Sequence, residues 1–153
     1  MQRSTVVLVG GFAAFGAGLL QSPTQYVLWQ ADLQIQSLTV SEAKGNLTVK
    51  IVVGSAFGEA VGARLEIMLP VGVGIVAMGA GCTAGPSVSG ISELRARVEC
   101  TLGNLQAHSN RTFTVVTTVP PAGVARGFGV IAMSDTPDPN PGNNFRERVI
   151  PLP

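Results

Sequence analysis

The chain changes character at about residue 30, where a continuous apolar stretch gives way to alternation of apolar and polar residues. Thr5 to Leu20 carries no charge and is mostly apolar, whereas after Gln30 apolar side chains recur at about every second position. A period of two is typical of strands with one buried face and one exposed face. The sequence therefore predicts an N-terminal hydrophobic segment at residues 1–30 and a β-domain at residues 31–153.

The alternation in residues 31–153 predicts seven or eight short strands. Turn-forming clusters such as Lys44-Gly45-Asn46 separate the runs, and no window after Gln30 combines helical periodicity with capping residues. Many short strands with one apolar face indicate an antiparallel β-sandwich, with a small barrel as the alternative closure. The alternating runs are residues 33–36, 47–53, 61–69, 94–102, 113–119, 128–132 and 145–152, with a shorter run at 73–78.

In the N-terminal segment a short basic start precedes the apolar stretch. This pattern predicts a hydrophobic helix that is either a membrane anchor or a secretory signal peptide. Gly10, Ala14 and Gly18 recur every four residues and would let another helix approach closely in a membrane. Tyr26 and Trp29 would then lie at the far membrane interface. No small-x-small cleavage pattern precedes Ala31 or the Gln21-Ser22 region. We therefore favour the anchor and keep the cleaved signal peptide as the alternative.

Composition and charge narrow the class of protein. Hydrophobic residues make up 46% of the chain and charged residues 12%, with 19 glycines and 10 prolines. This is too apolar for a disordered chain and too rich in turn residues for a helical bundle. The formal charge is +1 and basic residues are scattered singly, so a nucleic-acid partner is excluded, because that function needs a clustered basic face.

Two cysteines, Cys82 and Cys100, lie eighteen positions apart. A zinc site is not expected, because no second cysteine pair accompanies them and His108 is the single histidine. One disulfide is the natural interpretation if the domain lies outside the cytoplasm, and two buried thiols if it lies inside. The residues by themselves leave this alternative open.

Several motifs follow one another in a fixed order from residue 69 onward, and in that order they resemble a bacterial surface repeat known as domain of unknown function eleven. The resemblance covers about Ala31 to Leu152. It implies an immunoglobulin-like sandwich, an extracytoplasmic location and a structural or adhesive role without catalytic residues, and it is compatible with a bridge between Cys82 and Cys100. The motifs are Leu-Pro-Val-Gly-Val-Gly-Ile-Val (69–76), Gly-Cys-Thr-Ala (81–84), Cys-Thr-Leu-Gly-Asn-Leu (100–105), a Thr/Val strand (111–119) and Ser-Asp-Thr-Pro-Asp-Pro-Asn-Pro-Gly-Asn-Asn (134–144).

The last motif offers hard oxygen ligands, so a calcium site has to be weighed. The intervening prolines instead indicate a rigid turn whose side chains cap backbone amides, and we favour the turn and expect no metal. The residues concerned are Asp135, Asp138, Asn140, Asn143 and Asn144.

The remaining candidate chemistry is sparse. His108 is followed by Ser109, but nothing resembles a nucleophile elbow or an oxyanion loop, and a polar hairpin tip is the better interpretation. Paired carboxylates suited to acid–base work and a phosphate-binding loop are also missing from the sequence. We therefore expect no enzyme activity, no cofactor and no small-molecule ligand.

Arginine accounts for eight of the ten basic residues. Because its planar guanidinium suits bidentate pairing at interfaces, Arg95, Arg97, Arg146 and Arg148 are candidates for a protein interface, with a solvated strand face as the alternative. The sequence thus predicts a non-enzymatic accessory subunit, anchored in a membrane with its immunoglobulin-like domain on the periplasmic or extracellular face of a larger membrane or envelope complex. Its partners would be other protein subunits. The alternative is a secreted cell-surface or adhesion module whose signal peptide is cleaved.

Overall fold

The computed structural model of the chain describes residues 30–89, 94–124 and 126–150. Within these residues no helix is long and apolar enough to cross a membrane. The predicted N-terminal helix, with Gly10, Ala14, Gly18, Tyr26 and Trp29, lies outside them, so the anchor stays a prediction. The elements are β1 (Leu33–Ala43), β2 (Asn46–Ser55), β3 (Ala60–Met68), β4 (Ile75–Met78), β5 (Cys82–Ser89), β6 (Leu94–Leu105), β7 (Asn110–Thr118), β8 (Arg126–Met133), the 3-10 turn η1 (Pro141–Asn144) and β9 (Phe145–Ile150).

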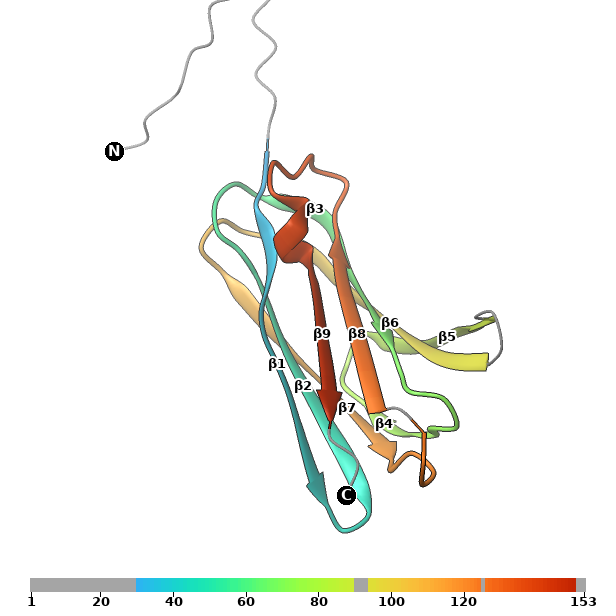
Figure 1. Ribbon diagram of the computed structural model, residues 1–153. Coiled ribbons are helices and arrows are strands. Elements are labelled where there is room, and N and C mark those ends of the chain that lie inside the picture. The colour runs from blue at the N-terminus through green and yellow to red at the C-terminus, as the bar shows by residue number, and fades with distance from the viewer. Residues whose placement is uncertain (1–29, 90–93, 125, 151–153) are drawn as a thin grey trace, which may run out of the picture.

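The strands form two antiparallel sheets packed face to face (Figure 1). One sheet has four strands in the order β1-β2-β7-β4, and the other has five in the order β5-β6-β3-β8-β9. The predicted antiparallel sandwich is therefore confirmed, and the alternative of a single closed barrel is wrong. The hairpin of β5 and β6 projects sideways from the body of the sandwich (Figure 1).

The described residues form nine strands, one or two more than the sequence predicts. The strand that was missed is β5, whose sequence Cys-Thr-Ala-Gly-Pro-Ser-Val-Ser lacks apolar alternation and contains Gly85 and Pro86. It becomes a strand because β6 pairs with it from Cys82 opposite Cys100 to Ser89 opposite Leu94. Such pairing is a tertiary property that a local pattern does not carry.

The core follows the alternation that the sequence shows. Every second residue from Leu47 to Val53 in β2 and from Ala63 to Ile67 in β3 is buried, and these side chains belong to one continuous hydrophobic cluster between the sheets. Burial of each valine, leucine or isoleucine among them stabilises the fold by about 1.5–3 kcal/mol. The fully buried side chains include Leu47, Val49, Ile51, Val53, Ala63, Leu65, Ile67, Val98, Leu102, Val115, Phe128 and Val130.

At two places a register shift makes the buried positions differ from those that strict alternation predicts. The first lies between Ile35 and Ser37 in β1, so that Leu38 follows Ile35 on the buried side. The second lies between Ala60 and Ala63 in β3. Val61, predicted on the buried face of this strand, is 43% exposed instead, because extra residues in a bulged strand change which side chains point inward.

Candidate functional site

The outer face of the five-stranded sheet, which points away from the other sheet, carries ion-paired side chains and exposed apolar side chains. Residues directly opposite each other on neighbouring strands project to the same side of a sheet, so the register defines this face. Its residues are Thr83, Arg95, Arg97, Glu99, Thr101, Arg64, Glu66, Met68, Gly127, Gly129, Ile131, Met133, Phe145, Glu147 and Val149.

An apolar strip crosses this face from β3 to β9 and consists of Met68, Ile131, Met133, Phe145 and Val149. Phe145 is 47% exposed and Val149 61% exposed. Phe145 lies opposite Ile131 in the β8–β9 pair. A Cβ at Gly129 would come within 2.9 Å of the Met68 methyl group and 3.8 Å of the Phe145 ring. Met68 and Phe145 therefore pack over the glycine backbone and join β3 to β9 in the strip. Glu147 separates Phe145 from Val149 on the same face of β9.

Ion pairs border the apolar strip on the β6 side. Glu66 and Glu99 lie directly opposite each other on β3 and β6, an arrangement that destabilises a sheet when both are charged. The Arg97 guanidinium resolves this: its Nη1 lies 3.2 Å from Glu66 Oε1, and its Nη2 bonds to Glu99. Arg97 is thus bound to its neighbours on the sheet, and its side chain is 22% exposed.

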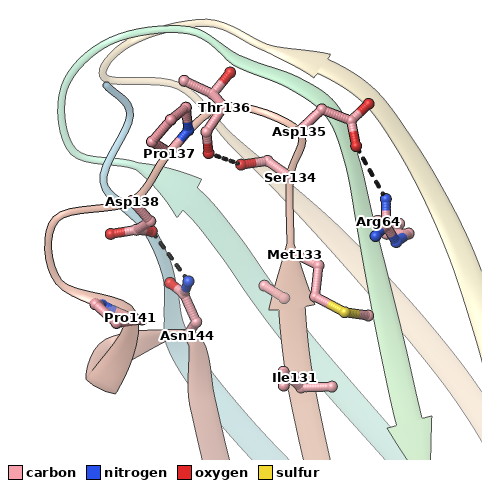
Figure 2. A pocket seen from close by; sticks show the side chains of 11 residues that line it. Arg64, Ile131, Met133, Ser134, Asp135, Thr136, Pro137, Asp138, Pro141 and Asn144 are labelled. Carbon is pink, nitrogen blue, oxygen red and sulfur yellow. Dashed lines mark hydrogen bonds and ion pairs between the residues drawn. The ribbon is translucent and has the colours of Figure 1, made fainter. Parts of the chain in front are cut away.

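Two shallow hollows adjoin on this face and share Arg64 and Met133. One has a volume of about 300 Å³ and lies over the Arg97 ion pairs. The other has a volume of about 460 Å³ and lies between β8 and the turn that leads to β9 (Figure 2). At its rim, Arg64 Nη1 is 3.3 Å from Asp135 Oδ1, with both side chains more than half exposed.

The turn beside the larger hollow is held by Asp138. Its Oδ1 accepts a hydrogen bond from the Asn140 amide at 2.8 Å, and its Oδ2 accepts one from the Leu33 amide at 2.9 Å. Asn144 Nδ2 donates to the same Oδ2 at 3.0 Å (Figure 2). The interpretation of this motif as a turn whose side chains cap backbone amides is confirmed. Among the described residues, no three His, Cys, Asp or Glu side chains lie close enough to hold a metal ion.

Cys82 and Cys100 form a disulfide with a sulfur–sulfur distance of 2.04 Å. Cys100 is 1% exposed and pairs with Leu65, so the bridge lies on the core side of the sheet. The alternative of two buried thiols is wrong. Because disulfides persist in oxidising environments, the bridge indicates that the domain lies outside the cytoplasm.

The four arginines of the predicted interface do not share one face. Arg95 and Arg97 lie on the outer face of β6. Arg146 and Arg148 lie opposite the buried Val130 and Phe128, on the side of β9 that points toward the other sheet.

Arg146 Nη1 donates to the Gln36 carbonyl of β1 at 3.3 Å and links the two sheets at this edge. Sequence reasoning missed the apolar strip. Two of its members, Phe145 and Val149, alternate with these arginines on β9 together with Glu147. Phe145 and Val149 stand four positions apart on β9, an exposed apolar repeat that could have indicated it.

His108 lies in the turn between β6 and β7, where it is exposed and has a φ of 60°. Its amide donates to the Ser55 carbonyl at 2.8 Å, and Ser109 Oγ donates to the Gln106 carbonyl at 2.6 Å. His108 therefore lies in a polar turn, as predicted, but the prediction of a hairpin tip is wrong, because β6 and β7 belong to different sheets. The Ser109 hydroxyl has a structural bond in this turn.

No family model and no curated protein matches this chain. Solved structures match it distantly. ChBD2 from Thermococcus kodakarensis KOD1 is 12% identical, with 67% of this chain and 92% of that one covered and a TM-score of 0.38. BslA, a bacterial hydrophobin, is 17% identical over 82% of this chain and 95% of that one, with a TM-score of 0.41.

A GH20 exo β-N-acetylglucosaminidase from Vibrio harveyi is 11% identical over 82% of this chain but only 18% of the enzyme, with a TM-score of 0.36. These matches name no family. They concern the fold alone, and the resemblance to domain of unknown function eleven stays a prediction.

Proposed function

We propose that this chain is a non-enzymatic, extracytoplasmic module that binds another protein through the outer face of its five-stranded sheet. The observation that carries the proposal is the apolar strip, in which Phe145 is 47% and Val149 61% exposed. Contiguous exposed apolar side chains mark interaction surfaces. The outer face also combines an aromatic residue, methionines and ion-paired arginines, which are residue types enriched at protein interfaces.

The order of the strands supports an immunoglobulin-like assignment. The four-stranded sheet, β1-β2-β7-β4, has the A-B-E-D order of a constant-type immunoglobulin domain, and β3-β8-β9 has the C-F-G order. The hairpin of β5 and β6 is then an insertion between strands D and E that pairs with the free edge of β3. This insertion widens the outer face by two strands and carries Arg95 and Arg97.

Membrane attachment through residues 1–30 is the second part of the proposal. Gly10, Ala14 and Gly18 would form the helix-packing stripe, with Tyr26 and Trp29 at the interface. The disulfide supports a domain on the periplasmic or extracellular side. Together these features fit an accessory subunit of a larger membrane or envelope complex.

A binding role is also consistent with the ion pairing of charged side chains on the outer face. Arg97 is paired with Glu66 and Glu99, and Arg64 with Asp135. None of these pairs includes a histidine or a hydroxyl group, such as nucleophilic catalysis uses.

Co-purification from native membranes tests the docking face. Val149→Glu places a charge in the apolar strip, and we expect it to remove a partner protein that co-purifies with the wild-type chain. The matched control is Thr112→Glu, an exposed residue on β7 in the other sheet, which should retain the partner. If both variants retain it, or both lose it while folded, the outer face is not the docking surface.

The intact mass of the native protein distinguishes the anchor from the secreted alternative. A mass that includes residues 1–30, released only by detergent, supports the anchored subunit. A mass that begins near residue 23 or 32 in a soluble fraction supports a secreted cell-surface or adhesion module.

A further inference from the structure

The strand β4 lies in an unusually apolar part of the chain. The sequence has no charged residue from Ile67 to Ser92 and no polar side chain from Val71 to Gly81. β4 is nevertheless exposed: Val76 is 53% and Met78 37% accessible to solvent, and Ala77 is also exposed. Exposed apolar segments of this kind are covered by a partner or cause aggregation.

β4 is an edge strand of the four-stranded sheet and pairs with β7 on one side. The Thr118 amide donates to the Gly74 carbonyl and the Gly79 amide to the Thr114 carbonyl, both at 2.9 Å, so each end of the strand is fixed. Its other side presents backbone N–H and C=O groups to which a further strand can bond.

The other edge strands of the described sandwich carry features that discourage a further strand. In β1 the Gln36 carbonyl is occupied by Arg146. β5 contains Pro86, which has no N–H to donate, beside a register shift. β9 carries three consecutive charges, Arg146, Glu147 and Arg148. Charges, prolines and bulges are devices that protect an edge, and β4 has a register shift but neither a charge nor a proline.

We propose that β4 pairs with β4 of a second copy of this chain, antiparallel about a two-fold axis, and joins the two four-stranded sheets into one. Antiparallel pairing of identical strands satisfies two-fold symmetry, so every contact is made twice. Because the segment carries no charge, no like charges meet across the axis, and pairing removes exposed apolar surface of β4 from water. A strand as short as Ile75–Met78 forms a small interface, so the dimer is weak, with a Kd in roughly the micromolar range.

Disulfide cross-linking of the full-length chain in detergent tests this pairing. Both native cysteines are in the Cys82–Cys100 bridge, so Val76→Cys introduces a single free thiol. When a mild oxidant is added, two such thiols near the axis lose two electrons and two protons and form an intermolecular disulfide. The control is Val149→Cys, which is more exposed, at 61%, and lies on β9 at the opposite side of the sandwich. We expect a cross-linked dimer with Val76→Cys and at least tenfold less with Val149→Cys.

A second variant makes the test independent of cross-linking. Val76→Lys places like charges across the axis and should reduce the mass in sedimentation equilibrium to that of the monomer, whereas Val149→Lys should leave it unchanged. Equal cross-linking at the two positions, or an unchanged mass for Val76→Lys, would overturn the proposal. So would lipid shielding of a fluorophore attached at Val76→Cys in phosphatidylcholine vesicles without any cross-link, because β4 would then face a lipid surface. Partner binding by the outer face is measured separately, so either proposal can fail alone.

Discussion

Leu33 and Asp138 lie 105 positions apart in the chain, yet the Leu33 amide donates a hydrogen bond of 2.9 Å to Asp138 Oδ2. This bond joins the start of the first strand to the turn that precedes the last one. The same carboxylate accepts the Asn140 amide and the Asn144 side chain. One side chain therefore holds both the shape of the turn and its position against β1.

Asp138→Ala should lower the free energy of unfolding by about 2–3 kcal/mol, because it leaves amides without their charged acceptor. Urea denaturation monitored by circular dichroism measures the change. Asp135→Ala is the control in the same turn: its ion pair with Arg64 is largely exposed, so its loss should cost less than about 1 kcal/mol. Equal effects of the two substitutions would contradict the capping role of Asp138.

Replacing both cysteines in the double variant Cys82→Ala with Cys100→Ala should lower the free energy of unfolding by about 3 kcal/mol, the loop-closure entropy of a bridge that spans 18 positions. The measurement compares denaturation midpoints with and without reductant. Reductant should shift the wild-type midpoint and leave that of the double variant in place. A wild-type midpoint that does not respond to full reduction would show that the bridge adds no stability.

Gly58→Ala should be among the most damaging small substitutions in the domain. Gly58 has a φ of +67°, and a Cβ there would collide with the backbone carbonyl of Gln30. Gly45 has a similar φ of +74° but nothing within 4 Å of its Cβ position. It therefore separates the cost of backbone strain from the cost of the steric clash. Gly45→Ala should cost about 1 kcal/mol through backbone strain alone, and Gly58→Ala at least about 2 kcal/mol more, measured by thermal unfolding. Similar losses at both sites would remove the contact with Gln30 from the explanation.

Arg97→Met should destabilise the fold by about 1–3 kcal/mol, because Glu66 and Glu99 would then face each other across adjacent strands without a cation. Arg95→Met, an exposed position on the same strand and face, should change stability by less than about 0.5 kcal/mol. Adding Glu66→Met to Arg97→Met should restore most of the loss. The same denaturation experiment measures this rescue. If the double variant were no more stable than Arg97→Met, Arg97 would act only through packing and not by neutralising the two glutamates.

Much of the sandwich could be predicted because half-buried strands leave a mark on adjacent residues. The period of two in β2, β3 and β6 arises from the pleat itself, which turns successive side chains to opposite faces. The prolines and short polar side chains around Asp138 likewise indicate a turn, since their preferences act over a few residues. The register shifts at Gln36 and Val61 were not visible, because a bulge is defined against the partner strand.

The amino-acid sequence by itself determined the sandwich class, most of its strands and the turn at residues 138–144, since these follow from local periodicity and local backbone preference. Only the tertiary structure decided that β5 is a strand, that Cys82 bonds to Cys100, and that Arg95 and Arg146 lie on different faces. It also decided that Phe145 and Val149 extend an apolar strip begun by Met68 on another strand, and that β4 forms an uncharged edge. The physical reason is that each of these features depends on which strands become neighbours, and that choice is made by the burial of the whole core.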